Sequence, residues 1–78
     1  MKVKIKLVGS LRKYKNDKIN ENGEVYLKPN STINDLINKI GINTDRKLIF
    51  LVNGKQQGLD FELSADDKVF ILTMVAGG

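Results

Sequence analysis

A single apolar stripe of helical period restricts what this chain can fold into. The i, i+3, i+4, i+7 spacing of one helix face is met by Ile33, Leu36, Ile37 and Ile40. Thr32 precedes the stripe as an N-cap, Asp35 follows three residues later as in a capping box, and Gly41 predicts a left-handed end. One such helix covers only one face of one sheet. The sequence therefore predicts an α+β domain with one helix and one sheet.

The segment before this helix contains the signals of two strands. Apolar residues alternate with lysines at the start of the chain, which predicts a half-buried strand through Val3, Ile5 and Leu7. Residues 11–14 are expected to form a short helical turn capped by Ser10. Val25 and Leu27 indicate a second strand, which we expect to pair with the first as an antiparallel hairpin.

The segment after the helix predicts three further strands. Residues 48–52 are continuously apolar, which is typical of a strand buried on both faces or nearly so. Asn53 and Gly54 give a type I′ turn signal, followed by a short return strand over 55–57 and a last strand over 68–74. A helical crossover returns the chain parallel to its start, so the first and last strands are expected to lie side by side.

This order of elements predicts a β-grasp, or ubiquitin-like, roll. The expected fold is a mixed sheet of four or five strands with one main helix packed on one face. The sequence divides into a single ubiquitin-like domain over residues 1–74 and a flexible Gly-Gly tail over residues 75–78.

The composition argues against catalysis by this chain alone. Its 78 residues include no histidine and no cysteine, which removes the commonest general base, the thiol nucleophile and most zinc and iron sites. We expect no metal site and read the chain as a partner of enzymes. Its apolar runs are far shorter than the roughly 18 residues of a membrane helix, and no signal-peptide core is present. The expectation is a cytoplasmic protein without a membrane partner.

The charge is unevenly distributed. The formal net charge is +4, and residues 1–18 hold seven basic residues against the single acid Asp17. Lys2, Lys4 and Lys6 recur at period two, as on the solvent face of a strand, and no run of aromatic residues accompanies them to stack bases. We therefore expect no nucleic-acid partner. A small basic module that binds RNA or an acidic protein remains the remote alternative.

The last strand has apolar residues on the face that the helix does not cover. If Val69 and Ile71 face the helix, the outward side chains are apolar, and they come from Val8, Phe70, Leu72 and Met74. Exposed apolar patches usually mark protein interfaces, so we predict a partner interface here. The alternative is that a loop or the short strand folds over these side chains.

The tail Val75-Ala76-Gly77-Gly78 follows the last strand without any anchoring sequence. Residues without side chains pass through a narrow slot and adopt backbone angles closed to other residues. We expect the tail to project, with Val75, Ala76 and Gly77 threading a partner's active site and Gly78 presenting its carboxylate. A frayed end or a cloning remnant is the alternative.

Several segments in their order and spacing resemble the small subunit of molybdopterin synthase, the molybdopterin sulfur-carrier family. They are residues 3–14, 31–37, 51–54, 63–69 and 75–78. The turn at residues 9–14 favours this family over the shorter thiamine sulfur carrier. The family often has two prolines before the tail, where this chain has Thr73-Met74, which bears on the stiffness of the tail and on the partner.

The resemblance implies that Gly78 is the reacting residue. A ubiquitin-activating-type enzyme would use ATP to adenylate its carboxylate, so this chain itself binds no cofactor. Sulfur from a persulfide-bearing partner would convert the adenylate to a thiocarboxylate. The large molybdopterin synthase subunit would then hold the tail while sulfur passes to a pterin precursor of the molybdenum cofactor. A thiamine-type carrier and a ubiquitin-like protein modifier are the alternatives.

Overall fold

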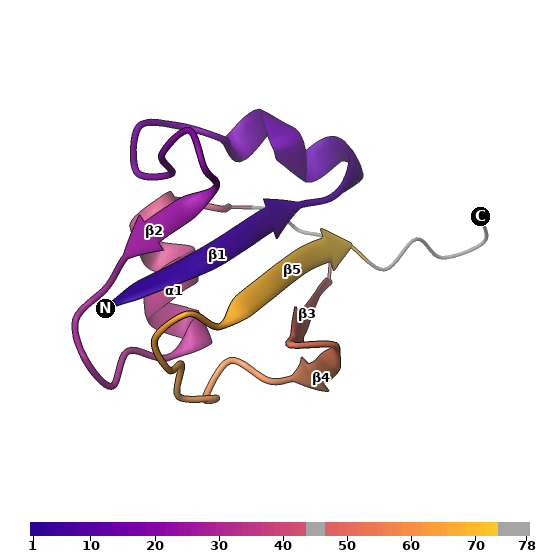
Figure 1. Ribbon diagram of the computed structural model, residues 1–78. Coiled ribbons are helices and arrows are strands. Elements are labelled where there is room, and N and C mark those ends of the chain that lie inside the picture. The colour runs from indigo at the N-terminus through magenta and orange to yellow at the C-terminus, as the bar shows by residue number, and fades with distance from the viewer. Residues whose placement is uncertain (44–46, 74–78) are drawn as a thin grey trace.

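Five strands form one mixed sheet in the order β2-β1-β5-β3-β4 (Figure 1). The computed structural model describes residues 1–43 and 47–73. The strands are β1 (Lys2–Leu7), β2 (Glu24–Tyr26), β3 (Leu48–Val52), β4 (Lys55–Gln57) and β5 (Lys68–Thr73). With one helix packed behind this sheet, the β-grasp prediction is confirmed.

The first and last strands lie side by side at the centre of the sheet, as predicted. β1 pairs with β5 in parallel, in a register that sets Lys6 beside Phe70. β5 pairs on its other side with β3, antiparallel, and the hairpins β1–β2 and β3–β4 complete the two halves. β5 is therefore the strand that joins both halves of the sheet.

The helix α1 (Ile33–Ile40) has the ends that the sequence predicts. Thr32 Oγ1 accepts a hydrogen bond from the Asp35 amide, 3.2 Å away, and the Asp35 carboxylate accepts one from the Thr32 amide at 2.9 Å. The chain leaves the helix at Gly41, whose φ of 84° is left-handed. Among the described residues, no helix is long and apolar enough to cross a membrane.

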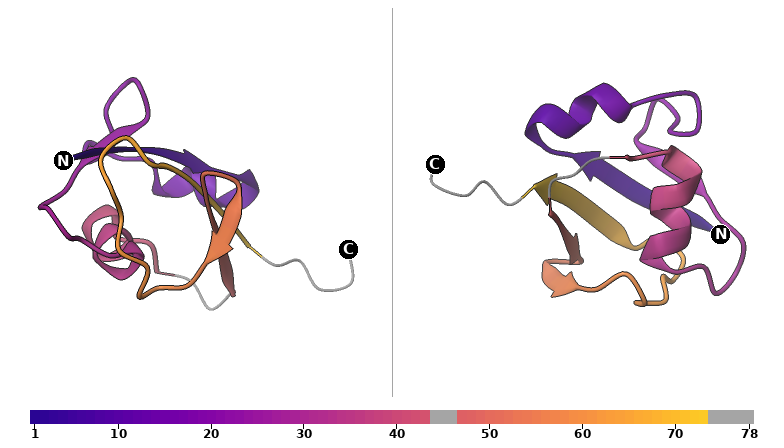
Figure 2. Two further views of the ribbon diagram at one scale, coloured as in Figure 1. Left: turned by 60° about the horizontal axis from the view of Figure 1, so that its bottom comes forward. Right: turned by 180° about the vertical axis from the view of Figure 1, so that it is seen from behind.

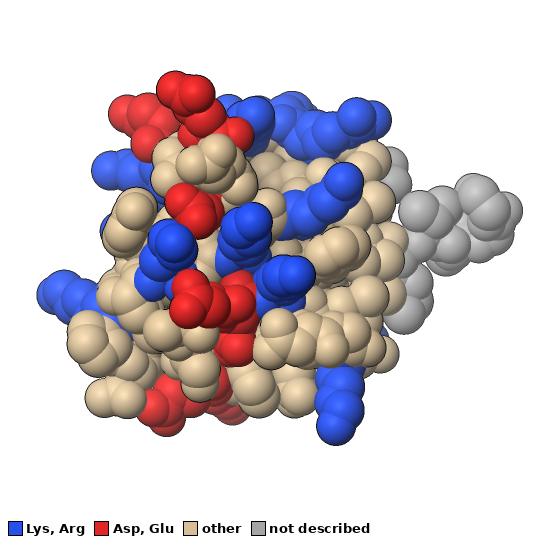
Figure 3. Space-filling view, viewed as in Figure 1, with Lys and Arg blue, Asp and Glu red and all other residues tan. Residues whose placement is uncertain are grey.

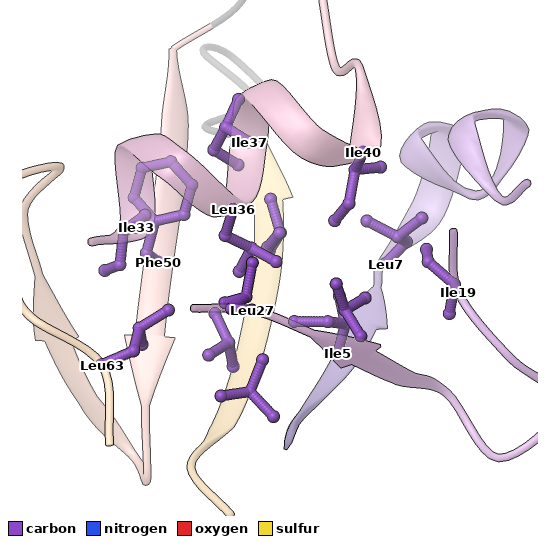
Figure 4. Packing of buried hydrophobic residues seen from close by; sticks show 14 of the residues in the cluster. Ile5, Leu7, Ile19, Leu27, Ile33, Leu36, Ile37, Ile40, Phe50 and Leu63 are labelled. Carbon is purple, nitrogen blue, oxygen red and sulfur yellow. The ribbon is translucent and has the colours of Figure 1, made fainter. Parts of the chain in front are cut away.

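The core lies between α1 and the inner face of the sheet. The helix crosses one face of the sheet, lying in front of the strands in the right-hand view of Figure 2, and Figure 4 shows its apolar side chains pointing toward them. All four stripe residues are buried: Ile33, Leu36, Ile37 and Ile40. They pack with inward residues of every long strand, including Val3, Ile5, Leu7, Phe50, Val52, Val69 and Ile71. The period of each segment thus determines which face it buries.

A 3₁₀ helix, η1 (Gly9–Tyr14), replaces the turn expected over residues 11–14. Our prediction that Ser10 caps it was wrong, because the helix begins two residues earlier than predicted, at Gly9, and no side chain caps it. Leu11 anchors η1 in the core. The connection after it is tied to the end of α1, since the Asn16 side-chain amide donates to the Ile40 carbonyl at 2.8 Å.

One strand boundary and one burial pattern differ from the predictions, and the predicted end of the domain is not tested. The second strand is Glu24–Tyr26, and Leu27 is buried just beyond it. The run at 48–52 is not buried on both faces, because Leu48, Ile49 and Leu51 are only half-buried. The last strand is described to Thr73, so the end of the predicted domain at residue 74 and the tail 75–78 lie outside the described residues.

Candidate functional site

The outward face of the sheet, opposite α1, exposes apolar side chains at one end. Phe70 of β5 is 43% exposed and Val8, just after β1, is 38% exposed. Leu72, two residues beyond Phe70, is half-buried. The Val8 amide donates to the Ile71 carbonyl at 3.0 Å, which holds Val8 next to the end of β5. The structure thus brings together three of the four predicted interface residues, and Met74 lies outside the described residues.

Strand β3 extends this surface with two residues that the sequence analysis did not assign to it. The antiparallel register places Leu51 beside Phe70 and Ile49 beside Leu72. Cross-strand partners share a face, so these half-buried side chains join the outward one. Hereafter the apolar patch means Val8, Ile49, Leu51, Phe70 and Leu72. The uninterrupted apolar run at 48–52 was the sequence signal for these outward apolar residues. A strand with one solvated face would instead alternate apolar and polar residues.

No described segment buries the side chains of Val8 and Phe70 in the apolar patch. The short strand β4 pairs with the edge of β3 and so extends the sheet sideways. The alternative that β4 covers the patch is therefore excluded. A large aromatic side chain that remains 43% exposed in a folded domain has a surface available to a partner.

Two shallow hollows flank the Phe70 side chain. One, of about 180 Å³, is lined by Lys4, Lys6, Asn22 and Lys68 together with Phe70 itself. The other, of about 210 Å³, lies toward β3 and is lined by Leu51, Asn53, Gly54, Lys68 and Phe70. Phe70 and Lys68 are common to both. Phe70 thus forms a ridge between two depressions. A partner with a socket for the Phe70 ring and with side chains that enter the two depressions would complement this shape.

Lysines and acids share this face (Figure 3), and Glu24 is the acid that forms an ion pair among the described residues. The Lys2 ammonium lies 3.2 Å from the Glu24 carboxylate across β1 and β2, and the Asn20 amide donates to Glu24 at 3.1 Å. The hydrogen bond from Asn20, and then that from Lys2, lowers the pKa of Glu24. The Glu24 carboxylate raises the pKa of Lys2. Figure 3 shows basic side chains over this face and over η1.

The reacting residues predicted from the sequence lie outside the described residues. They are Val75, Ala76, Gly77 and Gly78. The last described residue is Thr73, which is paired with Leu48 at the end of β5. Because β1 and β5 run parallel, this is also the end at which Val8 and Leu72 lie. Phe70 precedes Thr73 by three residues, about 10 Å of strand, so the apolar patch adjoins the point where the tail begins.

The fold is similar to two crystal structures of a protein from Haloferax volcanii. One, described as SAMP1, is 19% identical, with all of both chains covered and a TM-score of 0.68. The other, described as small archaeal modifier protein 1, is 16% identical, with 95% of this chain and 98% of that chain covered and a TM-score of 0.69. At these identities the likeness concerns the fold. No curated protein matches the chain.

A family match covers nearly the whole sequence. Residues 5–78 match the model of the ThiS family, from β1 through Gly77 and Gly78. Carriers of this type work with adenylating and partner enzymes. The chain therefore belongs to the ThiS family, with its ubiquitin-like sulfur-carrier fold.

Proposed function

We propose that this protein is a sulfur carrier that serves as the small subunit of molybdopterin synthase, with the Gly78 carboxylate as its reacting group. The observation that carries the proposal is the ThiS-family match, which runs through Gly77 and Gly78. The apolar patch supports it, because an enzyme that acts on this tail would need a grip on the adjoining sheet surface.

Activation begins at the carboxylate, which resists nucleophilic attack because of its charge and resonance. A ubiquitin-activating-type partner binds ATP, and a Gly78 oxygen attacks the α-phosphate with loss of pyrophosphate. The product is an acyl adenylate, in which AMP is a good leaving group. Gly77 and Gly78 carry no side chains, so they pass through a narrow channel to the nucleotide.

Sulfur enters by displacement of AMP. The terminal sulfur of a partner's cysteine persulfide attacks the Gly78 carbonyl carbon and forms an acyl disulfide. A thiol of the partner then attacks the disulfide at the partner's cysteine sulfur, releasing the Gly78 thiocarboxylate and leaving a disulfide on the partner. This exchange follows ordinary thiol–disulfide chemistry. The resulting sulfur anion is the nucleophile delivered to the acceptor.

The acceptor in this proposal is a pterin precursor of the molybdenum cofactor, held by the large synthase subunit. That subunit supplies the acids and bases that this chain, without histidine or cysteine, does not have. The helix η1 between β1 and β2 supports the molybdopterin-type assignment over the thiamine type, which is shorter here. Thr73-Met74 stands in this sequence where that family often has two prolines, so neither position has the fixed φ of a proline ring.

Intact-mass analysis of the protein purified from its own host tests this proposal. A fraction heavier by the exchange of one oxygen for sulfur, located at Gly78 by fragmentation, is the expected result. A matched variant with one alanine added after Gly78 should fold normally and show no such fraction. Absence of the mass shift in cells that produce the cofactor, or its presence in the extended variant, would contradict the proposal.

Reconstitution with the large subunit and the pterin precursor separates the two carrier types. The thiocarboxylate form should produce the dithiolene with that subunit. A thiamine-type carrier would instead sulfurate a thiazole precursor.

A protein modifier is the second candidate, and the fold likeness to a small archaeal modifier protein favours it. In that role the activated Gly78 carbonyl forms an isopeptide bond with a lysine of another protein. Host extract resolved on a denaturing gel would then contain conjugates that depend on Gly78. Conjugates without any thiocarboxylate would favour the modifier, and thiocarboxylate without conjugates would favour the carrier.

A further inference from the structure

We propose that Lys4, Lys6 and Lys68, here called the lysine triad, select a partner protein that carries carboxylates around an apolar socket for Phe70. This inference rests on the proposed function, since the partner in question is the enzyme that adenylates Gly78. It adds the charge of the partner surface to the apolar contact already described.

The first argument is a repulsion built into the sheet. Lys4 of β1 and Lys68 of β5 are direct partners in the parallel register, on the same outward face, and both are exposed. Neighbouring strands are about 4.8 Å apart, and like charges placed opposite each other across strands are destabilising. Glu24, the β2 partner of Lys4, attracts its charge without forming an ion pair with it. A carboxylate on a partner protein would therefore relieve the remaining repulsion between Lys4 and Lys68.

The second argument is that the triad's charge is not paired within the described structure. Among residues 1–43 and 47–73, Lys2 and Glu24 form the one ion pair. Glu24 lies opposite Lys4 in the β1–β2 register, but its two oxygens are bonded to Lys2 and to Asn20. Within those same ranges, Lys4, Lys6 and Lys68 therefore have no carboxylate within ion-pair distance.

The third argument is the position of these charges relative to the exposed ring. Lys6 is the direct partner of Phe70 across β1 and β5, and Lys68 precedes it by two residues on the same face. All three lysines line the hollow on the β1 side of Phe70, and Lys68 also lines the hollow on the β3 side. A complementary surface would place its acids at the rim of the socket, where charge determines partner choice and association rate.

A protein matches this surface better than RNA does. Phe70 adjoins Leu51 and Leu72, and together they form an apolar surface. The charged phosphate backbone of RNA does not complement such a surface. The second exposed aromatic residue on this face, Tyr26, is separated from Phe70 by the Glu24 carboxylate and by β1. Strand recognition by stacking requires a positive groove with successive aromatic platforms. The triad with its apolar neighbours therefore indicates an acidic protein.

The test is ATP–pyrophosphate exchange by the adenylating enzyme purified from the protein's own host. The KM for this chain and the kcat are measured at low and at high ionic strength. Lys4→Gln and Lys68→Gln, made singly and together, are compared with wild type and with Lys28→Gln, in the turn between β2 and α1. Lys28→Gln matches each single substitution in charge. Each triad substitution should raise KM about two- to fivefold at low salt, the loss expected for one partly exposed ion pair. The kcat should not change, and the difference should shrink as salt screens the charges.

Thermal unfolding provides a second readout that a structural role would not share. Because the double substitution removes a repulsion, its Tm should equal or exceed that of wild type while its KM rises. An unchanged KM, or an increase of the same size in Lys28→Gln, overturns the inference while leaving the proposed function intact. Loss of single-stranded RNA binding by the double variant with unaltered KM overturns it in favour of RNA. Wild-type protein that supports no Gly78-dependent exchange at either salt overturns the proposed function itself.

Discussion

The ammonium of Lys2 and the carboxylate of Glu24, 3.2 Å apart, join β1 to the edge strand β2. Asn20 donates to the same carboxylate, so the pKa of Glu24 is lower in the folded protein than in the unfolded chain. As pH falls, the unfolded state takes up this proton first, and the stabilisation is lost as pH falls through the folded pKa. It is fully present above the usual glutamate range.

We therefore expect Glu24→Gln to lower the free energy of unfolding at neutral pH and to flatten its decline in acid. Urea denaturation between neutral and strongly acidic pH measures both effects. Glu21→Gln, a change at an exposed position nearby, should reproduce the wild-type profile. Parallel acid profiles for wild type and Glu24→Gln would show that this carboxylate does not contribute.

Phe70→Ser should separate partner binding from stability. Because the ring is 43% exposed, its loss should change the free energy of unfolding by less than 1 kcal/mol or so, while weakening the complex with the activating enzyme at least tenfold. Its neighbour Ile71 is fully buried, so Ile71→Ala should cost about 2–5 kcal/mol of stability. Calorimetric titration and urea denaturation measure the two quantities. Unaltered affinity in Phe70→Ser would remove the patch from the binding surface.

Thr32→Ala should destabilise the protein by about 1 kcal/mol, because it removes the side-chain acceptor for the Asp35 amide at the start of α1. Asn38→Ala is the control, since Asn38 is an exposed residue inside the same helix, where alanine has the higher helix propensity. The two substitutions should thus shift the urea midpoint in opposite directions. Equal shifts would indicate that the capping box contributes nothing.

Asn53→Ala should cost about 1–2 kcal/mol, because the Asn53 side chain accepts from the Lys68 amide at 3.0 Å and donates to Asp67 at 2.9 Å. Its φ of 52° also lies in the left-handed region required by this hairpin. Gln56→Ala, at an exposed position of β4, should stay within 0.5 kcal/mol or so of wild type. Guanidinium unfolding of both variants makes the comparison.

Local signals were sufficient for the parts of the fold that depend on neighbouring residues. The stripe of α1, its capping box and the turn at Asn53-Gly54 are encoded within a few positions, and all are found. The placement of β5 beside β1 followed from the geometry of a helical crossover. By contrast, the start of η1 at Gly9 was missed, because a 3₁₀ helix without a side-chain cap leaves little sequence signal.

The candidate site was predictable in part for a related reason. Phe70 and Leu72 were found because they alternate with the core residues Val69 and Ile71. Ile49 and Leu51 were not assigned to the apolar patch from the sequence. A continuous apolar run has the same sequence pattern whether the second face of its strand is covered or exposed to solvent. Only the strand order and register show that this face has no second layer. The roles of Gly78 and of the lysine triad stay predictions.

The central position of β5 has a consequence for synthesis on the ribosome. The β3–β4 hairpin attaches to the rest of the sheet through β5 alone among the described strands. A nascent chain whose Lys68–Thr73 segment is still inside the exit tunnel therefore holds two separate hairpins and an incomplete core. The sheet can be completed only after this strand has left the tunnel, so a copy truncated before Lys68 would lack the strand that joins β1 to β3.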